Sequence, residues 1–175
     1  MVQKKRGTDD GIPALIAALA DPSIDKRHEA VSALREIGEP AVAPLITAIA
    51  EAQDNDGRWY AAVALSKIGK PAVAPVIAAM GVHSGREFRK YAAAALGEIG
   101  EPAIEPLIDG MASDDRELRG FLSQALCRIG KPAVEPLTRR LGHDNEILRS
   151  CASLTLFQMG ETGLPSMVET MEKDR

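Results

Sequence analysis

Apolar residues recur along the chain at the spacing of one helix face, and the arrangement appears six times. They stand at positions i, i+3, i+4 and i+7, which places their side chains on one face of an α-helix. Each set therefore predicts one helix, the first helix of a repeating unit. The sets are Ile12, Leu15, Ile16, Leu19; Val42, Leu45, Ile46, Ile49; Val73, Val76, Ile77, Met80; Ile104, Leu107, Ile108, Met111; Val134, Leu137, Thr138, Leu141; and Leu164, Met167, Val168, Met171.

A second helix is predicted in each unit, and it ends at a glycine. The glycines, 30 or 31 residues apart, are Gly38, Gly69, Gly100, Gly130 and Gly160. Positions 1, 4, 5 and 8 residues before each glycine are almost all apolar, so they form a buried face. Glycine supplies the left-handed residue that ends a helix, and a proline two residues after the first four glycines starts the next one. A second proline, four residues later, is expected to shorten the new helix or tighten its first turn.

A fixed period of this length is typical of a repeat array. The pattern predicts an all-α solenoid of five helical hairpins, at residues 12–38, 39–69, 70–100, 101–130 and 131–160, closed by a capping helix within 161–175. One hairpin cannot bury its own apolar stripe, so the hairpins must stack into a single repeat domain. Residues 1–11 are expected to form a flexible polar tail.

Composition narrows the function. The chain is 45% apolar but only 3% aromatic, so its core must be aliphatic, and its net charge is −4 with a pI of about 5.4. This balance argues against a nucleic-acid groove. No apolar run is long enough to span a membrane. Cys127 and Cys151 lack metal-binding spacing, which is typical of reduced thiols in a cytoplasmic protein. No phosphate loop, GxSxG or HExxH motif is present.

The sequence Ile-Gly-Glu/Lys-Pro-Ala-Val, following a helix of pattern Arg-x-x-Ala-x-x-Ala-Leu-x-x-Ile-Gly, resembles HEAT repeats. The resemblance extends from Gly11 to Lys173 and is closest to the short subclass of phycobilisome lyases and small archaeal and bacterial scaffold proteins. It implies a right-handed, armadillo-like superhelix whose second helices line the concave side. It also implies a scaffold that binds other macromolecules.

An arginine stands eleven residues before each of the five glycines that end the second helices. The position begins on the buried face of the second helix, so each guanidinium is expected to bond carbonyls or carboxylates in the turn between helices. Candidate partners are Asp21, Asp54, Asp114 and Asp144. The resemblance to HEAT repeats supports such a structural ladder, and an anion-binding ladder is the alternative. The five arginines are Arg27, Arg58, Arg89, Arg119 and Arg149.

All six aromatic residues fall on second helices. Tyr60, Tyr91 and Phe121 share the position nine residues before a glycine, and Trp59 precedes Tyr60. We expect a row of rings that binds a protein or peptide partner on the concave surface, because amphipathic aromatics dominate binding interfaces. The alternative is that these rings cap the core. The predicted partner-binding residues are Trp59, Tyr60, Lys90, Tyr91, Phe121 and His28.

Three further hypotheses arise. His28-Glu29 is similar to the ligand pair of deoxyhypusine hydroxylase, but no other repeat has a second pair, so we expect no metal, no cofactor and no catalysis. Similarity to the phycobilisome-lyase repeats leaves a tetrapyrrole-binding, phycobilin-lyase-like role as the main alternative. The N-terminal helix, from Ile12 to Ala20, is largely apolar, which favours self-association through the first repeat.

Overall fold

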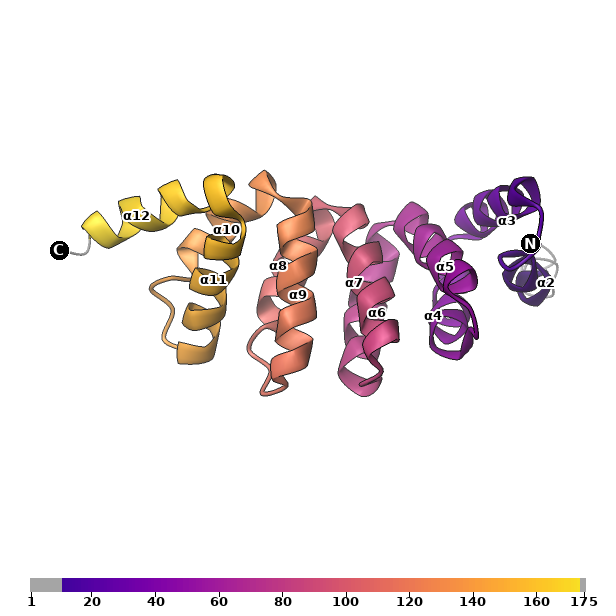
Figure 1. Cartoon of the computed structure of the whole chain (residues 1–175), viewed down its shortest axis with the longest axis horizontal. Coiled ribbons are helices and arrows are strands. Elements are labelled where there is room, and N and C mark those ends of the chain that lie inside the picture. Colours follow the sequence, from indigo (N-terminus) through magenta and orange to yellow (C-terminus); the bar gives the residue numbers. More distant parts are fainter. Residues whose placement is uncertain (1–10, 174–175) are drawn as a thin grey trace, which may run out of the picture. The chain divides into compact units, whose positions relative to one another are not determined.

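Helices are the only regular elements among residues 11–173, the range that the computed structural model describes apart from the side chains of residues 167 and 170–173. Figure 1 shows them in chain order. The predicted flexible tail lies outside the described residues except for Gly11. The elements are α2 (Ile12–Ala18), α3 (Ile24–Ile37), η1 (Glu39–Ala41), α4 (Val42–Glu51), α5 (Asn55–Ile68), α6 (Lys70–Val82), α7 (Arg86–Ile99), η2 (Glu101–Ala103), α8 (Ile104–Gly110), α9 (Arg116–Ile129), η3 (Lys131–Ala133), α10 (Val134–Arg139), α11 (Glu146–Gln158), η4 (Gly160–Thr162) and α12 (Leu164–Lys173).

Second helices α3, α5, α7 and α9 each end immediately before a glycine with positive φ. Gly38 has φ 75° and ψ −134°, and Gly69 has φ 80° and ψ −138°. The positive φ agrees with the sequence analysis, but the ψ values lie far from those of a left-handed helix. This region of backbone space is essentially restricted to glycine. The Gly38 N–H still closes the helix by donating to the Leu34 carbonyl at 3.1 Å.

The first helices begin with a tight turn. In three hairpins the Glu-Pro-Ala or Lys-Pro-Ala segment forms a 3₁₀ turn, η1, η2 or η3, before the α-helix starts. Proline has no N–H, so Pro44 cannot donate to the carbonyl four residues earlier and the tighter turn takes its place. This agrees with the expected effect of the second proline. The third hairpin differs, because α6 continues from Lys70 to Val82 with Pro75 inside it.

The chain divides into two compact units, Met1–Ala95 and Leu96–Arg175. In the first unit α2 packs against α3 and α4, and α5 packs against α3 and α4. Helices of one hairpin thus contact each other, and helices of the same kind contact those of the next hairpin. The result is one layer of first helices and one layer of second helices.

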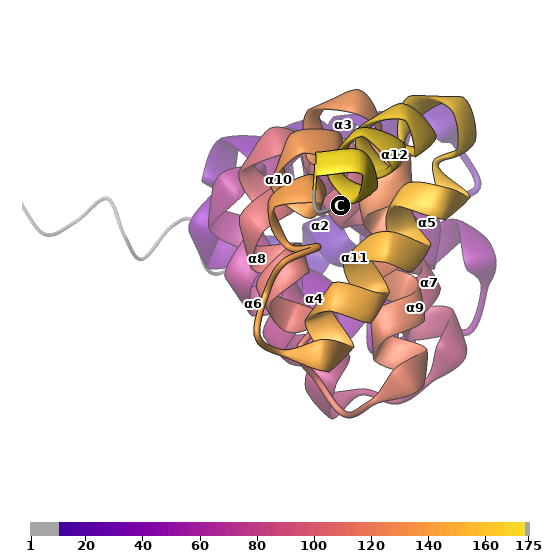
Figure 2. The same ribbon diagram turned by 90° about the vertical axis from the view of Figure 1, so that its left-hand side faces the viewer.

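The second unit has the same arrangement. Its helix α8 packs against α9 and α10, while α11 packs against α9, α10 and α12. Figure 2 shows α8 and α10 on one side of this unit and α9 and α11 on the other. Helix α12, a first helix with no described second helix after it, contacts α10 and α11.

The core follows the apolar columns predicted from the sequence. The leucine four residues before each glycine is fully buried in all five second helices; these are Leu34, Leu65, Leu96, Leu126 and Leu156. The predicted fold class is therefore confirmed as an all-α stack of helical hairpins with a closing C-terminal helix. Within the described range, no helix combines the length and the apolar character that a membrane span requires.

Candidate binding surface

The N-terminal halves of α3 and α5, which lie side by side in the first unit, carry His28, Trp59 and Tyr60. The start of α5 is fixed by Asp54, whose carboxylate accepts the Gly57 N–H at 2.6 Å. This N-cap satisfies a donor at the helix end that would otherwise lack a partner. The helix start therefore holds the following turn, which contains Trp59 and Tyr60, in a defined position.

Tyr60 is held by two residues of α3. The Arg27 guanidinium carbon lies 5.2 Å from the centre of the Tyr60 ring. The His28 ring meets the same ring edge-on, with centroids 5.7 Å apart and an interplanar angle of 83°. Arg27 also donates to the Asp56 carboxylate at 2.8 Å, and this hydrogen bond raises the pKa of the arginine. The cluster fixes the orientation of Tyr60 through cation–π and edge-to-face contacts.

Trp59 stands beside this cluster with 44% of its surface exposed. It is the single tryptophan of the chain. Trp59, Tyr60 and His28 lie together on α3 and α5, and we call these three residues the Trp59 surface.

The remaining predicted binding residues do not extend this surface into an exposed row. Tyr91 is only 8% exposed and Phe121 only 7%, so both rings belong to the buried part of the molecule. The expectation of an exposed row is corrected here in favour of the core-capping alternative. The physical reason is the small size of the core residues one turn further along each helix: Ala95 and Ala125 are buried and leave room that a ring at the edge of the buried face fills. Lys90 is exposed, with its Nζ 5.1 Å from the Tyr91 ring centre.

The arginine column makes one repeated contact. In every hairpin the guanidinium donates to the backbone carbonyl six residues earlier, in the turn that precedes the second helix. The carbonyls belong to Asp21, Ala52, His83, Ser113 and His143. The sequence analysis expected carbonyls or carboxylates as partners, and backbone carbonyls accept these five bonds. The carboxylate that Arg27 contacts is that of Asp56, which was not among the four candidates.

Three exposed apolar residues of the second unit were not among the binding residues predicted from the sequence. Leu154 and Phe157 on α11 are 56% and 61% exposed, and Val168 on α12 is 49% exposed. One signal was available. The position of Phe157, three residues before the glycine, holds Arg35, Ser66, Gly97 and Cys127 in the other repeats, so a phenylalanine there departs from the pattern.

A buried polar contact joins α9 and α11. The Ser123 and Thr155 hydroxyls lie 2.8 Å apart, and Ser123 donates to the Gln158 side-chain oxygen at 2.9 Å.

Both cysteines, Cys127 and Cys151, are unpaired and partly buried, and burial raises the pKa of each thiol above its usual value. A raised pKa lowers the thiolate fraction at neutral pH, so neither cysteine has the character of an activated nucleophile.

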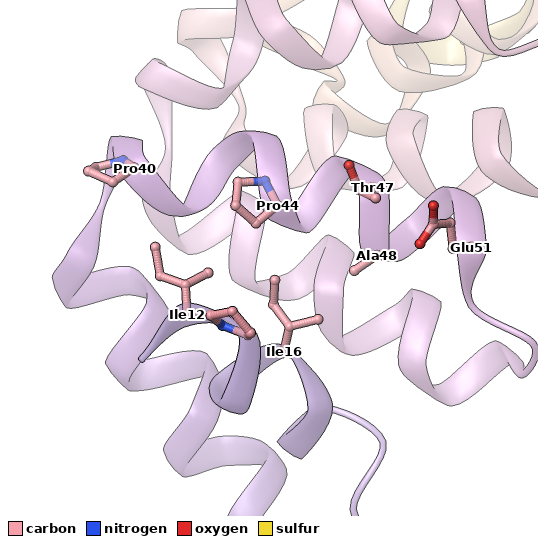
Figure 3. A pocket seen from close by; sticks show the side chains of 8 residues that line it. Ile12, Ile16, Pro40, Pro44, Thr47, Ala48 and Glu51 are labelled. Atoms are coloured by element: carbon pink, nitrogen blue, oxygen red, sulfur yellow. The ribbon is translucent and has the colours of Figure 1, made fainter. Parts of the chain in front are cut away.

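Open grooves run between consecutive first helices in both units. In the first unit a groove of about 700 Å³ lies between α2 and α4, and Figure 3 shows Ile12 and Ile16 pointing from α2 toward Pro44 and Ala48. In the second unit a groove of about 660 Å³ lies between α10 and α12 and includes Lys131 and Glu135. The recurrence of such grooves indicates that they follow from hairpin stacking.

His28 and Glu29 were considered as metal ligands in the sequence analysis, which expected no metal site. Over the described side chains, no three His, Cys, Asp or Glu residues gather closely enough to hold a metal ion. His28 instead packs against Tyr60.

The hairpins have nearly constant length and end at glycine turns, and their first and second helices form two separate layers. These features define a helical-repeat protein of the α-solenoid class. Comparison of the sequence with known families agrees with this class. The family model "HEAT repeats" matches residues 12–97, and the model "PBS lyase HEAT-like repeat" matches residues 88–113. Together the two matches support a HEAT-repeat protein of the PBS-lyase-like type.

Comparisons with individual proteins are less informative. No curated protein matches the sequence. Among solved structures, a designed armadillo repeat protein in complex with the peptide (KR)4 is 17% identical, with 93% of this chain and 90% of that chain covered and a TM-score of 0.35. An engineered protein is 18% identical, with 92% and 85% covered and a TM-score of 0.35. Similarities this low do not bear on function.

Proposed function

We propose that this HEAT-repeat protein is a non-catalytic scaffold that binds a protein or peptide through the Trp59 surface. The observation that carries the proposal is the exposure of Trp59 beside a tyrosine whose orientation is already fixed. Tryptophan and tyrosine are enriched among the residues that contribute most to binding energy. A partner that covers Trp59 would bury a large apolar ring without displacing the core.

The fixed orientation of Tyr60 lowers the cost of binding. Ordering a side chain at an interface costs about 0.5–1.5 kcal/mol. Tyr60 is already restrained by Arg27 and His28, so much of that cost is met in the unbound protein. The surface is therefore organised before the partner arrives, and the charged residues beside Tyr60, Arg27 and Asp56, would set specificity and association rate.

The test uses Trp59 both as a binding residue and as a probe. Peptides that bind the wild-type protein would be selected from a random-peptide phage library. We expect their binding to shift the fluorescence of Trp59, the single tryptophan, to shorter wavelength as the ring becomes buried. Replacing Trp59→Ala should weaken binding at least tenfold, which corresponds to about 1.4 kcal/mol. The melting temperature should change little, because the ring is 44% exposed.

Val82→Ala provides the matched control, because Val82 is an apolar residue of the same unit and 81% exposed. This variant should bind the selected peptides as the wild type does. Unchanged affinity in Trp59→Ala, or equal weakening in both variants, would contradict the proposal. The phycobilin-lyase-like alternative is tested by mixing the protein with a free bilin. Uptake of colour that Trp59→Ala abolishes would assign the same surface to a tetrapyrrole instead.

A further inference from the structure

A carboxylate stands one helical turn before the exposed tryptophan. Asp56 and Trp59 lie three residues apart on α5, so their side chains project from neighbouring turns of one helix face. The Asp56 side chain is 68% exposed and Trp59 is 44% exposed. Arg27 donates to one oxygen of the Asp56 carboxylate, Oδ2, at 2.8 Å. The two residues therefore present a carboxylate and an aromatic ring to solvent side by side.

The same combination already holds a cation within the protein. The Arg27 guanidinium carbon lies 5.2 Å from the centre of the Tyr60 ring, and the guanidinium pairs with the Asp56 carboxylate. Among the described side chains, cations lie over the rings of Tyr60 and Tyr91, and none lies over Trp59. Tryptophan attracts cations more strongly than tyrosine does. The ring best suited to a cation is thus the one that remains open to a partner.

The charges around this pair also favour a cation. The N-terminal halves of α3 and α5, with the turns before them, carry six carboxylates and three basic side chains within residues 21–33 and 51–63. This is an excess of three negative charges. On α7 the equivalent positions hold Glu87 and Lys90, which lie 3.4 Å apart and offset each other. The negative excess is therefore local to the helices that carry the Trp59 surface.

We propose that the Trp59 surface recognises a basic peptide, with one arginine or lysine side chain placed over the Trp59 ring and paired with the Asp56 carboxylate. This inference rests on the proposed function and adds the charge of the partner to it. Arginine suits the pair best, because its planar guanidinium stacks on a ring while it donates to a carboxylate. An acidic peptide would be repelled by the local excess of carboxylates.

The test uses the peptides that the phage selection yields. We expect them to contain arginine or lysine beside an apolar residue. Each peptide is synthesised a second time with citrulline in place of arginine and acetyl-lysine in place of lysine, which removes the charge. In fluorescence anisotropy, the neutral peptide should bind the full-length protein at least fivefold more weakly. Raising the salt concentration to 0.5 M should reduce this difference, because salt screens exposed charges.

Asp56→Asn tests the role of the carboxylate. The ratio of the two affinities should fall toward one in this variant, because a neutral amide cannot form an ion pair with the peptide. Disturbance of Tyr60 through Arg27 would instead weaken both peptides by the same factor and leave the ratio unchanged. Glu51→Gln is the matched control, since it removes an exposed carboxylate of the same unit from the first helix α4. This control should keep the wild-type ratio.

The outcomes separate this inference from the proposed function. Peptides that depend on Trp59 but lack basic residues, or that bind equally well after neutralisation, would overturn the inference and leave the proposed function in place. An unchanged ratio in Asp56→Asn, or an equal fall in Glu51→Gln, would also overturn it. If no selected peptide depends on Trp59, both the inference and the proposed function fail.

Discussion

At the scale of single residues, the glycines of this chain serve two different purposes. Gly38, Gly69, Gly100 and Gly130 have positive φ but open space where a Cβ would stand. Gly163 is the opposite case. Its backbone is ordinary, but an added Cβ would lie 2.2 Å from the Leu156 carbonyl oxygen and 3.0 Å from the Leu156 Cα. The first group is required by backbone conformation, and Gly163 is required by the close approach of η4 to α11.

Gly163→Ala should destabilise the protein. Because the clashing atoms belong to the backbone, a flexible side chain cannot relieve the contact, and α12 must shift from its position against α11. Overpacking of this kind costs about 1–3 kcal/mol. Urea unfolding followed by circular dichroism should show a lower midpoint for the variant.

Gly142→Ala is the matched control, because an added Cβ at that position meets no atom within 4 Å. Its unfolding midpoint should stay close to the wild-type value, within about 0.5 kcal/mol of stability. Equal midpoints for Gly163→Ala and Gly142→Ala would show that the turn before α12 can relax.

At the scale of helices, the arginine column attaches each second helix to the turn before it. The contact is the same in all five hairpins, but its environment differs. Arg89 is 1% exposed, and its Nε lies 3.0 Å from the carbonyl oxygens of both Met80 and His83. Arg149 makes the corresponding contact at 2.7 Å to His143 where solvent has access. The same bond should therefore contribute unequally to stability.

Arg89→Ala should lower stability by about 2–4 kcal/mol, because it deprives the buried Met80 carbonyl and the partly buried His83 carbonyl of the guanidinium donor. Arg89→Lys should not restore the loss, since an ammonium cannot reproduce the planar geometry of the guanidinium. Arg149→Ala should cost less than about 1 kcal/mol, because water replaces the lost donor. Chemical unfolding of the three variants would measure these differences. A similar loss in Arg89→Ala and Arg149→Ala would contradict the dependence on burial.

The helices and their core were predictable because local patterns determine them. The Leu34 column, the helix ends at glycine and the tight first turns all follow from sequence spacing. The burial of Tyr91 and Phe121 was not predictable in the same way. A residue at the edge of the buried face can turn toward the core or the solvent, and the outcome depends on how much space neighbouring alanines leave. The exposure of Phe157 depends likewise on which helix, if any, lies over α11.

At the scale of the whole molecule, the sequence favours self-association through the first repeat, and this prediction can be tested. The exposed residues of α2 are small: Pro13, Ala14 and Ala17. The groove beside them is lined by Ile12 and Ile16. These residues offer an apolar but shallow surface, so we expect association only at high protein concentration.

Sedimentation velocity would test this expectation. The sedimentation coefficient of the wild type should rise with concentration, and Ala17→Lys should remove the rise, because a lysine ammonium is costly to bury in an apolar contact. The substitution lies on the exposed side of α2 and should leave the fold intact. A wild-type protein that remains monomeric over the whole concentration range would rule out association through this repeat.

The bond from each arginine to a carbonyl six residues earlier closes inside one hairpin. Consequently, loss or duplication of a complete hairpin would leave this bond intact in all the others. Each glycine turn would likewise be removed or added as a whole. Such an array can change length in steps of thirty or thirty-one residues during evolution, and an engineer can use the same step to lengthen the surface available to a partner.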